Sequence, residues 1–324
     1  MISIKVGVVG GAGYTAGELL RILVNHPNVE IAFVHSNSNA GNPITDVHSG
    51  LIGETDLVFT SELSFDKVDA LFLCSAHGDS KKFMAENNVP AAVKIIDLST
   101  DYREKRTDHD FVYGLPELNA SEIRKAQHVA NPGCFATCIQ LGLLPLAASG
   151  MLTDDIHVNA ITGSTGAGVK PSATSHFSWR NNNISIYKAF NHQHLQEIGQ
   201  SLHQLQKNFD AAVNFIPVRG NFARGIYATI YTKSNLNIEE AKSLYKDFYK
   251  DAAFTFVVDK NPDMKQVVNT NKGIVYLEKH GDKLLIVSMI DNLLKGASGQ
   301  AVQNMNLMFG LDEKAGLGLK SIGF

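Results

Sequence analysis

A glycine-rich loop between a predicted strand and a predicted helix limits the fold of this chain more than any other feature. Every second residue from Ile2 to Val8 is apolar, which predicts a strand. Gly7, Gly10 and Gly13 follow at three-residue intervals, and leucines then recur at helical spacing in residues 19–23. Glycines let the backbone approach a pyrophosphate on a helix N-terminus, so Gly10 and Gly13 are candidate cofactor ligands. The spacing differs from the strict G-x-G-x-x-G pattern, and a tight structural turn is the alternative interpretation.

Strand-like and helix-like segments continue to alternate up to about residue 150. Strands are predicted at residues 29–36, 68–75 and 94–99, and helical residues 81–87 separate the last two. Because parallel neighbouring strands need a crossover connection, alternation at this pace is typical of a parallel sheet with helices packed on it. The first part of the chain is therefore predicted to be an α/β domain with a Rossmann-type, doubly wound parallel sheet.

The second part of the chain has the pattern of an α+β domain. An amphipathic helix is predicted at residues 238–249, between segments with the composition of strands. The strand-like segments are residues 157–162, 213–218, 226–232, 273–277 and 284–290. The last two flank a turn at residues 280–282 and predict a hairpin, so we expect a mainly antiparallel sheet.

Two domains are expected from the length of 324 residues and the hydrophobic content of 44%. We predict a cofactor-binding domain at residues 1–147 and a substrate and oligomerisation domain at residues 148–296. Residues 297–324 begin with a further helical pattern and are predicted to pack back on the first domain.

Charge and cysteine content exclude several classes of protein. The formal net charge is −3 and the basic residues are dispersed, which gives no electrostatic argument for nucleic acid. No apolar stretch reaches the roughly 18 residues that a membrane span needs, and the chain begins directly with a strand instead of a signal peptide. Three cysteines without a metal-type spacing argue against disulfides and a structural zinc site. These features favour a cytoplasmic protein.

Cys134 lies at a turn directly ahead of an apolar helix predicted at residues 135–148. Pro132 and Gly133 end the strand-like run before it. A thiol at a helix N-terminus faces unpaired N–H groups and the positive end of the helix dipole, which favour the thiolate. Cys134 is therefore a candidate nucleophile, with a buried hydrophobic role as the alternative, whereas Cys74 and Cys138 are predicted to be packing residues.

Six separated motifs, in order along nearly the whole chain, resemble those of the N-acetyl-γ-glutamyl-phosphate reductase family, which is related to aspartate-semialdehyde dehydrogenase. They comprise residues 10–20, 97–103, 113–118, 131–137 with Gly142 and Pro145, 192–198 and 291–301. The most specific is Asn-Pro-Gly-Cys-Phe-Ala-Thr around Cys134. The resemblance implies an NADP-dependent reductase of an acyl phosphate in arginine biosynthesis.

The resemblance also implies a covalent mechanism. The Cys134 thiolate would displace phosphate to form a thioester, which a nicotinamide hydride would reduce to the semialdehyde. His192 matches the family position for a general acid–base, with His194 as the second candidate and Glu197 at a spacing that could orient an imidazole or support a helix N-terminus.

Two arginines are expected to bind the anionic groups of the substrate, because a guanidinium binds carboxylate and phosphate bidentately. By resemblance to the related dehydrogenases, Arg103 would hold the phosphate, and Arg219 is expected to hold the α-carboxylate. A surface salt bridge is the alternative for each arginine.

The end of the second predicted strand bears on the choice of cofactor. Ser36 and Ser38 lie there without the Asp or Glu that would bind a ribose 2′-hydroxyl, which favours NADP. Asn37 occupies the position where the family usually has an arginine, so the ratio of NADP to NAD is left open. By resemblance, Asn292 and Gly296 would lie beside the nicotinamide.

Other readings of the sequence are a sister enzyme and a sensor. An N-succinyl or carrier-linked glutamyl or aminoadipyl phosphate would use the same chemistry, and the sequence does not identify the acyl group. An NADP-binding sensor would keep the fold and lose the reaction, although it would have no need of Cys134, His192, Arg103 and Arg219. The expected partners are a small acyl phosphate and further copies of the chain, in a homodimer or a homotetramer.

Overall fold

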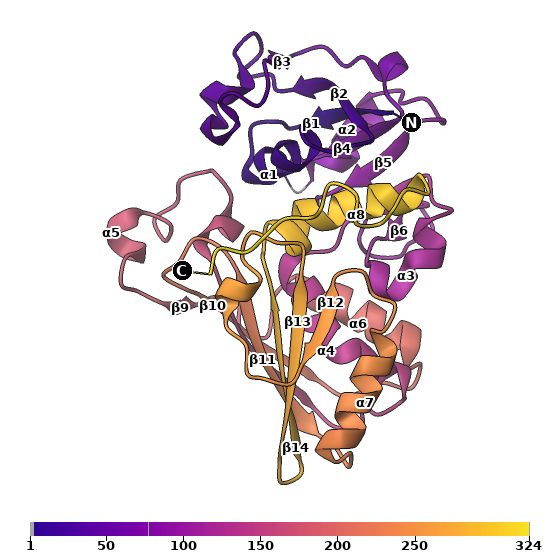
Figure 1. Cartoon of the computed structure of the whole chain (residues 1–324), viewed down its shortest axis with the longest axis vertical. Coiled ribbons are helices and arrows are strands. Elements are labelled where there is room, and N and C mark those ends of the chain that lie inside the picture. Colours follow the sequence, from indigo (N-terminus) through magenta and orange to yellow (C-terminus); the bar gives the residue numbers. More distant parts are fainter. Residues whose placement is uncertain (1–2, 77, 324) are drawn as a thin grey trace. The chain divides into compact units, whose positions relative to one another are not determined.

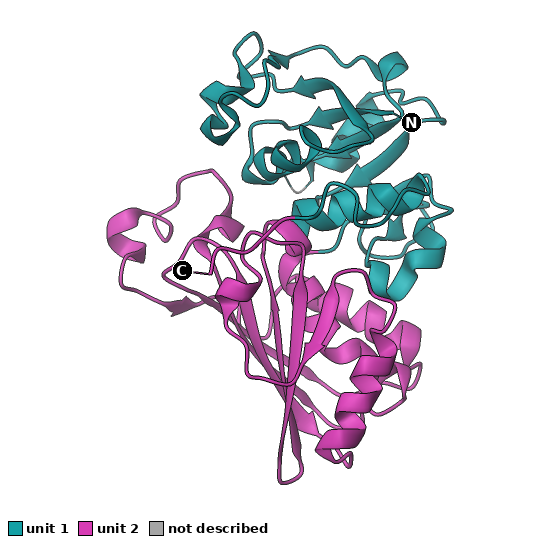
Figure 2. Cartoon of the chain, in the orientation of Figure 1, with its two compact units in different colours: residues 1–132, 297–318 teal, residues 133–296, 319–324 magenta. Residues whose placement is uncertain are grey.

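A computed structural model describes residues 3–76 and 78–323. The chain forms two compact units: unit 1 comprises residues 1–132 and 297–318, and unit 2 comprises residues 133–296 and 319–324 (Figure 2). Ile2, predicted to begin the first strand, and Phe324 lie outside the described residues. Among the residues that are described, no helix has the length and apolarity needed to cross a membrane.

Unit 1 contains a seven-stranded sheet in which every pairing is parallel (Figure 1). Its order is β3-β2-β1-β4-β5-β7-β6. The strands are β1 (Ile4–Val9), β2 (Val29–His35), β3 (Phe59–Thr60), β4 (Ala70–Leu73), β5 (Lys94–Asp97), β6 (Val112–Tyr113) and β7 (His128–Ala130). The prediction of a Rossmann-type parallel sheet is confirmed.

Helices α1 (Tyr14–Leu23), α2 (Asp79–Glu86), α3 (Pro116–Ile123) and α8 (Gly299–Met308) complete unit 1. α2 packs through Phe83 and Met84 against a cluster of sheet side chains that includes Leu71 and Ile95. α8 contacts α1, α3 and β5, so the predicted return of the chain to the first unit holds for this helix. Residues 319–324 instead belong to unit 2.

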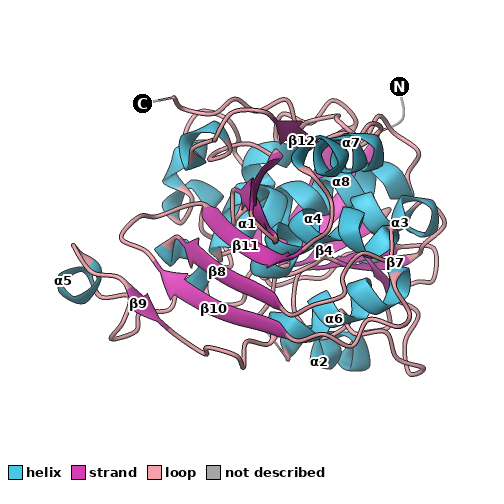
Figure 3. Cartoon of the chain, turned by 90° about the horizontal axis from the view of Figure 1, so that it is seen from below, coloured by secondary structure: helices cyan, strands magenta, loops and turns pink. Residues whose placement is uncertain are grey.

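Unit 2 contains a second seven-stranded sheet, in the order β12-β13-β14-β11-β8-β10-β9. Four of its six pairings are antiparallel, and β12–β13 and β8–β10 are parallel, so the predicted mainly antiparallel sheet is confirmed. Figure 3 shows β11, β8 and β10 side by side in this sheet. The strands are β8 (Ile156–Thr162), β9 (Ser185–Ile186), β10 (Val213–Arg219), β11 (Ile226–Lys233), β12 (Thr255–Val258), β13 (Gly273–His280) and β14 (Lys283–Ile290).

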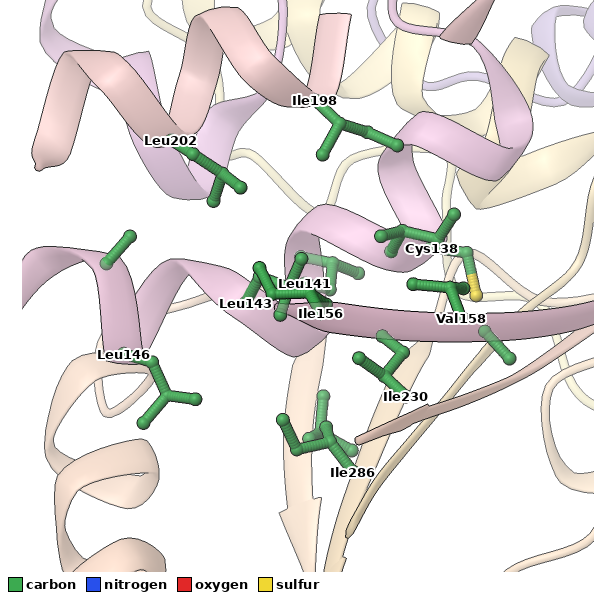
Figure 4. Packing of buried hydrophobic residues seen from close by; sticks show 14 of the residues in the cluster. Cys138, Leu141, Leu143, Leu146, Ile156, Val158, Ile198, Leu202, Ile230 and Ile286 are labelled. Carbon is green, nitrogen blue, oxygen red and sulfur yellow. The ribbon is translucent and has the colours of Figure 1, made fainter. Parts of the chain in front are cut away.

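One face of this sheet is covered by α4 (Cys134–Ala148), α6 (His194–Leu205) and α7 (Ile238–Phe248). A continuous cluster of buried side chains joins the three helices to β8, β11 and β14 (Figure 4). A short helix, α5 (Phe177–Arg180), lies in the segment between β8 and β9. The two residues of β9 extend the edge of the sheet beside β10.

Helix α4 belongs to unit 2, whereas we predicted a domain boundary after residue 147. The units divide between Pro132 and Gly133. The physical reason is that α4 is apolar on all sides, with every residue from Phe135 to Ala147 buried, and it packs on β11, β13 and β14 of the second sheet. The strand-like run before Pro132 and the helix after Gly133 are contiguous in sequence, so the sequence alone places them in one domain.

Candidate active site

Cys134 is the first residue of α4, and Gly133 is its N-cap. The thiol is partly exposed, whereas Cys138 one turn later is fully buried. The N-cap has no side chain to accept a hydrogen bond from the first turn, so the positive end of the helix faces Cys134. A helix N-terminus of this kind favours the thiolate form of a cysteine.

Gly296 lies directly against Cys134. A Cβ atom at residue 296 would lie 2.8 Å from the Cβ of Cys134 and 3.2 Å from its Cα, so only glycine allows this approach. Gly296 lies within a π-helical segment, Leu294–Ser298, and its N–H donates to the carbonyl of Asp291, five residues earlier, at 2.9 Å. A late motif of the sequence therefore forms one wall of the thiol site.

Glu197 of α6 is bonded to the residue before the nucleophile. Its carboxylate is 3% exposed, and Oε2 accepts a hydrogen bond from the Gly133 N–H at 2.9 Å. Its Oε1 lies 3.9 Å from Nε2 of His194. Of the two functions that the spacing allowed for Glu197, the structure thus shows support of the start of α4, with an imidazole at longer range.

His192 lies in the same part of unit 2. Its ring makes an edge contact with the ring of Phe135, the residue after Cys134, with centroids 5.5 Å apart. His194 has its ring centroid 4.6 Å from that of His192. Burial and, to a lesser extent, the charge of Lys188 lower the pKa of His192 to about 4. His192 is therefore a neutral imidazole near pH 7.

Tyr187, which no motif of the sequence indicates, connects the thiol region to Arg219. The Arg219 guanidinium carbon lies over the Tyr187 ring, 4.7 Å from its centroid. Burial, followed by the negative charge of the Cys134 thiolate, raises the pKa of Tyr187 to about 12, while Arg219 counteracts the shift. Tyr187 therefore remains protonated and interacts electrostatically with both residues.

Arg219 is the last residue of β10, and one of its side-chain donors is unpaired. Its Nε atom is buried and has no hydrogen-bond partner among the described residues. Its backbone carbonyl accepts a hydrogen bond from Nη1 of Arg180, at 2.9 Å. Arg180, which is 6% exposed, also donates to the carbonyl of Thr174. Arg180 thus fixes the segment between β8 and β9 to the end of β10.

Asn292 has its amide engaged within unit 2. Its Oδ1 accepts from the Gly225 N–H at 2.7 Å, and its Nδ2 donates to Thr165 Oγ1 at 3.0 Å. It is 1% exposed. Asn292 therefore ties the loop after β8, residues 163–168, to the start of β11.

The neighbouring Asp291 is fully buried and organises the same segment. Arg224 donates to both of its carboxylate oxygens, from Nε and Nη2, at 3.1 Å each. The backbone N–H groups of Asn269 and Leu293 also donate to it. Because a buried carboxylate needs this many donors, the cluster is a structural support for the turn that leads to Gly296.

In unit 1, the glycine loop has the geometry of a pyrophosphate cradle. Gly10 has φ +78°, and a Cβ there would lie 2.9 Å from the backbone of Cys74, so another residue would be strained. Gly13 is the N-cap of α1, and a Cβ there would meet nothing within 4 Å. The open space at the positive end of α1 fits a dinucleotide phosphate.

His48, which the sequence analysis did not select, supports this loop. Its Nε2 lies 2.7 Å from the Gly11 carbonyl oxygen. The ring also lies against α1, where a Cβ at Gly17 would be 2.6 Å from His48 Nδ1. The His48 ring, from the segment that follows β2, leaves no room for a side chain at residue 17, which explains the glycine inside α1.

The serines predicted to hold the ribose lie at the end of β2. Ser36 is buried and Ser38 exposed, and Nδ2 of Asn39 donates to the hydroxyl of each, at 3.2 and 3.0 Å. Asn37 is exposed in the same turn. The turn offers hydroxyl and amide groups and no carboxylate.

Arg103 is 6% exposed and is bound to the backbone of unit 1. Its Nε donates to the carbonyl of Asn131 at 2.8 Å, and its Nη2 donates to the carbonyl of Leu98 at 2.9 Å. Arg103 thereby connects the ends of β5 and β7 close in sequence to Cys134. No three metal-ligating side chains come together in the part of the chain that the structure describes.

Comparisons with known proteins agree with this arrangement. Residues 5–126 match a family model described as the NAD binding domain of semialdehyde dehydrogenase, and residues 134–292 match one described as its dimerisation domain. The fold and site therefore define a semialdehyde dehydrogenase, a class that uses a nicotinamide cofactor.

Relatives named N-acetyl-gamma-glutamyl-phosphate reductase match the full chain. The one from Parabacteroides distasonis is 68% identical, over 99% of this chain and 100% of its own. Those from Bacteroides thetaiotaomicron and Flavobacterium johnsoniae are 67% and 57% identical over the same shares. The chain belongs to the N-acetyl-γ-glutamyl-phosphate reductase family and is an oxidoreductase, as the sequence motifs predicted.

Solved structures show the same fold at low identity. Aspartate semialdehyde dehydrogenase II of Vibrio cholerae superposes with a TM-score of 0.74 at 16% identity, over 96% of this chain and 99% of that one. Aspartate semialdehyde dehydrogenase of Candida albicans, solved with NADP, has a TM-score of 0.70 at 14% identity, over 95% and 98%.

Proposed function

We propose that the protein reduces N-acetyl-γ-glutamyl phosphate to N-acetylglutamate 5-semialdehyde and phosphate, in arginine biosynthesis. The observation that carries this proposal is the position of Cys134 at the N-terminus of α4. A full-length relative that is 68% identical is named N-acetyl-gamma-glutamyl-phosphate reductase. An acyl phosphate is an activated carbonyl that a thiolate can attack at neutral pH.

Cys134 is the proposed nucleophile. Its thiolate attacks the acyl carbon, phosphate leaves, and a thioester remains on the enzyme. The nicotinamide cofactor, when bound, supplies the hydride that reduces this thioester. The sulfur then leaves, which releases the semialdehyde and restores the thiolate. His192 is the proposed partner of the carbonyl oxygen, because its ring centroid lies 5.5 Å from that of Phe135, whereas the centroid of His194 lies 6.3 Å away.

Two arginines are proposed to bind the anionic ends of the substrate. Arg219 would hold the α-carboxylate, which its buried, unpartnered Nε and its position over Tyr187 support. Arg103 would hold the phosphate. Since Arg103 is also bonded to the carbonyls of Leu98 and Asn131, its loss would disturb the backbone as well as phosphate binding.

NADP is the proposed cofactor. Gly10 and Gly13 would hold the pyrophosphate at the N-terminus of α1, and Ser36 and Ser38 would contact the adenosine ribose phosphate. Asn292 and Gly296 would border the nicotinamide, Asn292 through its backbone, since its amide is bonded within unit 2, and Gly296 through its approach to Cys134.

Self-association as a homodimer or a homotetramer is part of the proposal. The match of residues 134–292 to a dimerisation domain supports it. The face of the second sheet away from α4 carries the exposed side chain of Tyr231 and the partly exposed Tyr227, which a second copy could cover. Light scattering on the purified chain distinguishes the two assemblies. Three free cysteines are in accord with a reducing cytoplasm.

The reverse reaction tests the proposed function. Purified protein is mixed with N-acetylglutamate semialdehyde, phosphate and either NADP or NAD, and nicotinamide absorbance is followed. Phosphate-dependent reduction of NADP is expected. Activity only with an N-succinyl or carrier-linked analogue would change the substrate and keep the mechanism. Silence with every semialdehyde would overturn the enzymatic proposal and favour the sensor.

A further inference from the structure

We infer that Arg180 is a positioning residue for Arg219. Arg180 fixes the backbone at Arg219 and adds a second positive charge beside it, so that Arg219 binds a carboxylate in one orientation and with higher affinity. This function of Arg180 rests on the proposed function of the protein, in which Arg219 holds the α-carboxylate of the substrate. No motif of the sequence indicates Arg180, and its hydrogen bonds carry the inference.

The side chain of Arg180 makes five hydrogen bonds within unit 2. Its Nε donates to the Thr174 carbonyl at 3.3 Å, and its Nη1 donates to the carbonyls of Asn183, at 3.3 Å, and Arg219, at 2.9 Å. Its Nη2 donates to the Thr174 carbonyl at 3.1 Å and to Ser185 Oγ at 3.3 Å. A guanidinium has five N–H groups, so these bonds leave none for a ligand. Arg180 therefore acts on the site through Arg219 and does not bind the substrate.

Arg180 bonds to both members of one residue pair between β9 and β10. Ser185 lies opposite Arg219 in this antiparallel pairing, and Arg180 donates to the hydroxyl of the first and to the carbonyl of the second. The pairing comprises only two residues of each strand, and so short a ladder is weak by itself. The bonds from Arg180 therefore restrain the backbone from which the Arg219 side chain extends.

The backbone around Arg180 needs this support. Asn182, Lys188 and Phe190 have φ values of +53°, +47° and +59°, and they are three of the four non-glycine residues with positive φ in the described part of the chain. A left-handed backbone is unfavourable for residues with a Cβ atom, so contacts elsewhere must impose it. Arg180 supplies such contacts, because it ties the carbonyls of residues 174 and 183, on either side of it, to the end of β10.

Each of the two guanidinium groups lies against an aromatic ring. The guanidinium carbon of Arg180 is 4.7 Å from the centroid of Trp179, and that of Arg219 is 4.7 Å from the centroid of Tyr187. Stacking on a ring holds the plane of a guanidinium and leaves the N–H groups at its edge accessible. For Arg219 these groups include the buried Nε, which has no partner among the described residues. A planar carboxylate can accept two parallel hydrogen bonds at this edge.

The charges of Arg180 and Arg219 reinforce each other. Residues 156–196 and 211–238, which include β8, β9 and β10, contain no Asp or Glu, and the partners of Arg180 are carbonyl and hydroxyl oxygens without a net charge. Burial and, after it, the positive charge of Arg219 lower the pKa of Arg180, so the two guanidinium groups repel each other. An anion bound by Arg219 relieves this repulsion and is therefore held more tightly.

The direct test uses Trp179, which is the only tryptophan of the chain and is 39% exposed. Quenching of its fluorescence by iodide, an anion, is compared with quenching by acrylamide, which is neutral, in the full-length protein without substrate. Because positive charge concentrates iodide, Arg180→Gln should lower the ratio of the two quenching constants by about twofold or more, whereas Arg180→Lys should keep it.

The matched control for this test is Lys170→Gln, which removes an exposed positive charge from the same segment and should change the ratio less. An unchanged ratio in Arg180→Gln, or an equal fall in Lys170→Gln, overturns the inference. This readout needs no substrate, so its failure is distinguishable from failure of the reverse assay.

The kinetic test separates positioning of Arg219 from a general structural function. In the reverse assay, Arg180→Gln should raise the KM for the semialdehyde by about tenfold or more and change kcat by less than about threefold, because the carboxylate lies away from the reacting carbon. The KM for phosphate should stay at the wild-type value, since phosphate is proposed to bind at Arg103. A fall in kcat together with a rise in both KM values would show a structural function alone.

Arg180→Lys replaces the Gln variant if that variant does not fold. It keeps the charge but loses the planar fork, so it should raise the KM for the semialdehyde by less than Arg180→Gln does. Lys170→Gln should have the wild-type KM for the semialdehyde. A wild-type KM in Arg180→Lys, or an equal rise in Lys170→Gln, would contradict the positioning of Arg219 by Arg180.

Discussion

The first and second turns of helix α4 carry the same side chain in opposite surroundings. Cys134 is partly exposed at the N-terminus and touches Gly296. Cys138 is fully buried, its thiol donates to the Ser288 carbonyl at 3.2 Å, and burial raises its pKa to about 12. The different chemistry of these two cysteines therefore follows from their positions along the helix and from their burial.

The remaining turns of α4 are built for packing. Pro145 has no N–H, so the carbonyl of Leu141 lacks its helical donor, and the Tyr249 hydroxyl donates to it at 2.6 Å. The Tyr245 hydroxyl donates to the neighbouring Gly142 carbonyl, also at 2.6 Å. We therefore expect changes in the first turn to affect activity, and changes further along to affect stability.

The largest expected effect is the loss of turnover in Cys134→Ser. A serine hydroxyl is a far weaker nucleophile and a poorer leaving group than a thiolate, so kcat should fall by roughly 10⁴-fold or more. Cofactor binding, measured by fluorescence of the reduced nicotinamide, should be unchanged. The matched variant is Cys138→Ser, which should keep most of the activity. Substantial turnover in Cys134→Ser would contradict a covalent mechanism.

The next effect is expected at Gly296. In Gly296→Ala the new Cβ must push Cys134 aside, and displacement of a nucleophile by a fraction of an ångström to 1 Å costs up to about 10²-fold in kcat. Rate constants for alkylation of Cys134 and kcat should both change, while the melting temperature changes little. Gly199→Ala, in open space on α6, is the control and should leave kcat unaltered. Equal kcat values for the two variants would contradict the view that Gly296 positions the Cys134 thiol.

A stability effect without a catalytic one is expected at Tyr249. Tyr249→Phe removes the donor to the Leu141 carbonyl and leaves a buried acceptor unsatisfied, at a cost of about 1–3 kcal/mol in the free energy of unfolding. Urea unfolding gives the loss, and the reverse assay should give an unchanged kcat at a temperature where the variant is folded. A fall in kcat larger than the fall in folded fraction would show that the later turns of α4 also affect activity.

The smallest expected effect is the contribution of His192, near the first turn of α4, to the pH dependence of the free energy of unfolding. The pKa of His192 is about 4 in the folded protein against 6.5 as the ordinary value. Between these values the unfolded chain binds a proton that the folded chain does not, so stability falls as the pH falls from about 6.5 to about 4. His192→Gln should make the free energy of unfolding less dependent on pH in that window. Urea unfolding at several pH values measures the slope, and identical slopes would argue against a neutral His192.

Much of the fold could be predicted from periodicity. The central strands of both sheets and helices α1, α4 and α7 have clear apolar patterns or caps. The two-residue strands β3 and β6 are too short to show alternation, and α3 has a weak amphipathic pattern and a non-helical residue, Asn119. The compact units divide before α4 and the predicted boundary lies after it, because sequence continuity does not indicate which sheet an all-apolar helix covers.

The candidate site was predictable where a backbone feature marked it. Glycines with positive φ or close contacts, such as Gly10 and Gly296, and a thiol after Pro-Gly have local signals. No local signal in the sequence indicates the positions of Tyr187 and His48, because each contacts partners more than 30 residues away in the chain. The amide of Asn292 likewise bonds to Gly225 and Thr165, which the motif itself does not indicate.

The contact between Gly296 and Cys134 also has an architectural consequence. Apart from the tail at residues 319–324, unit 2 is one continuous insertion in the chain of unit 1. This insertion begins at Gly133, next to Cys134, and ends at Gly296. An insertion whose ends meet can leave and re-enter its host without stretching it. Residues 133–296 thus form an insertion that is continuous in sequence and whose two ends are held together by contacts within unit 2 itself.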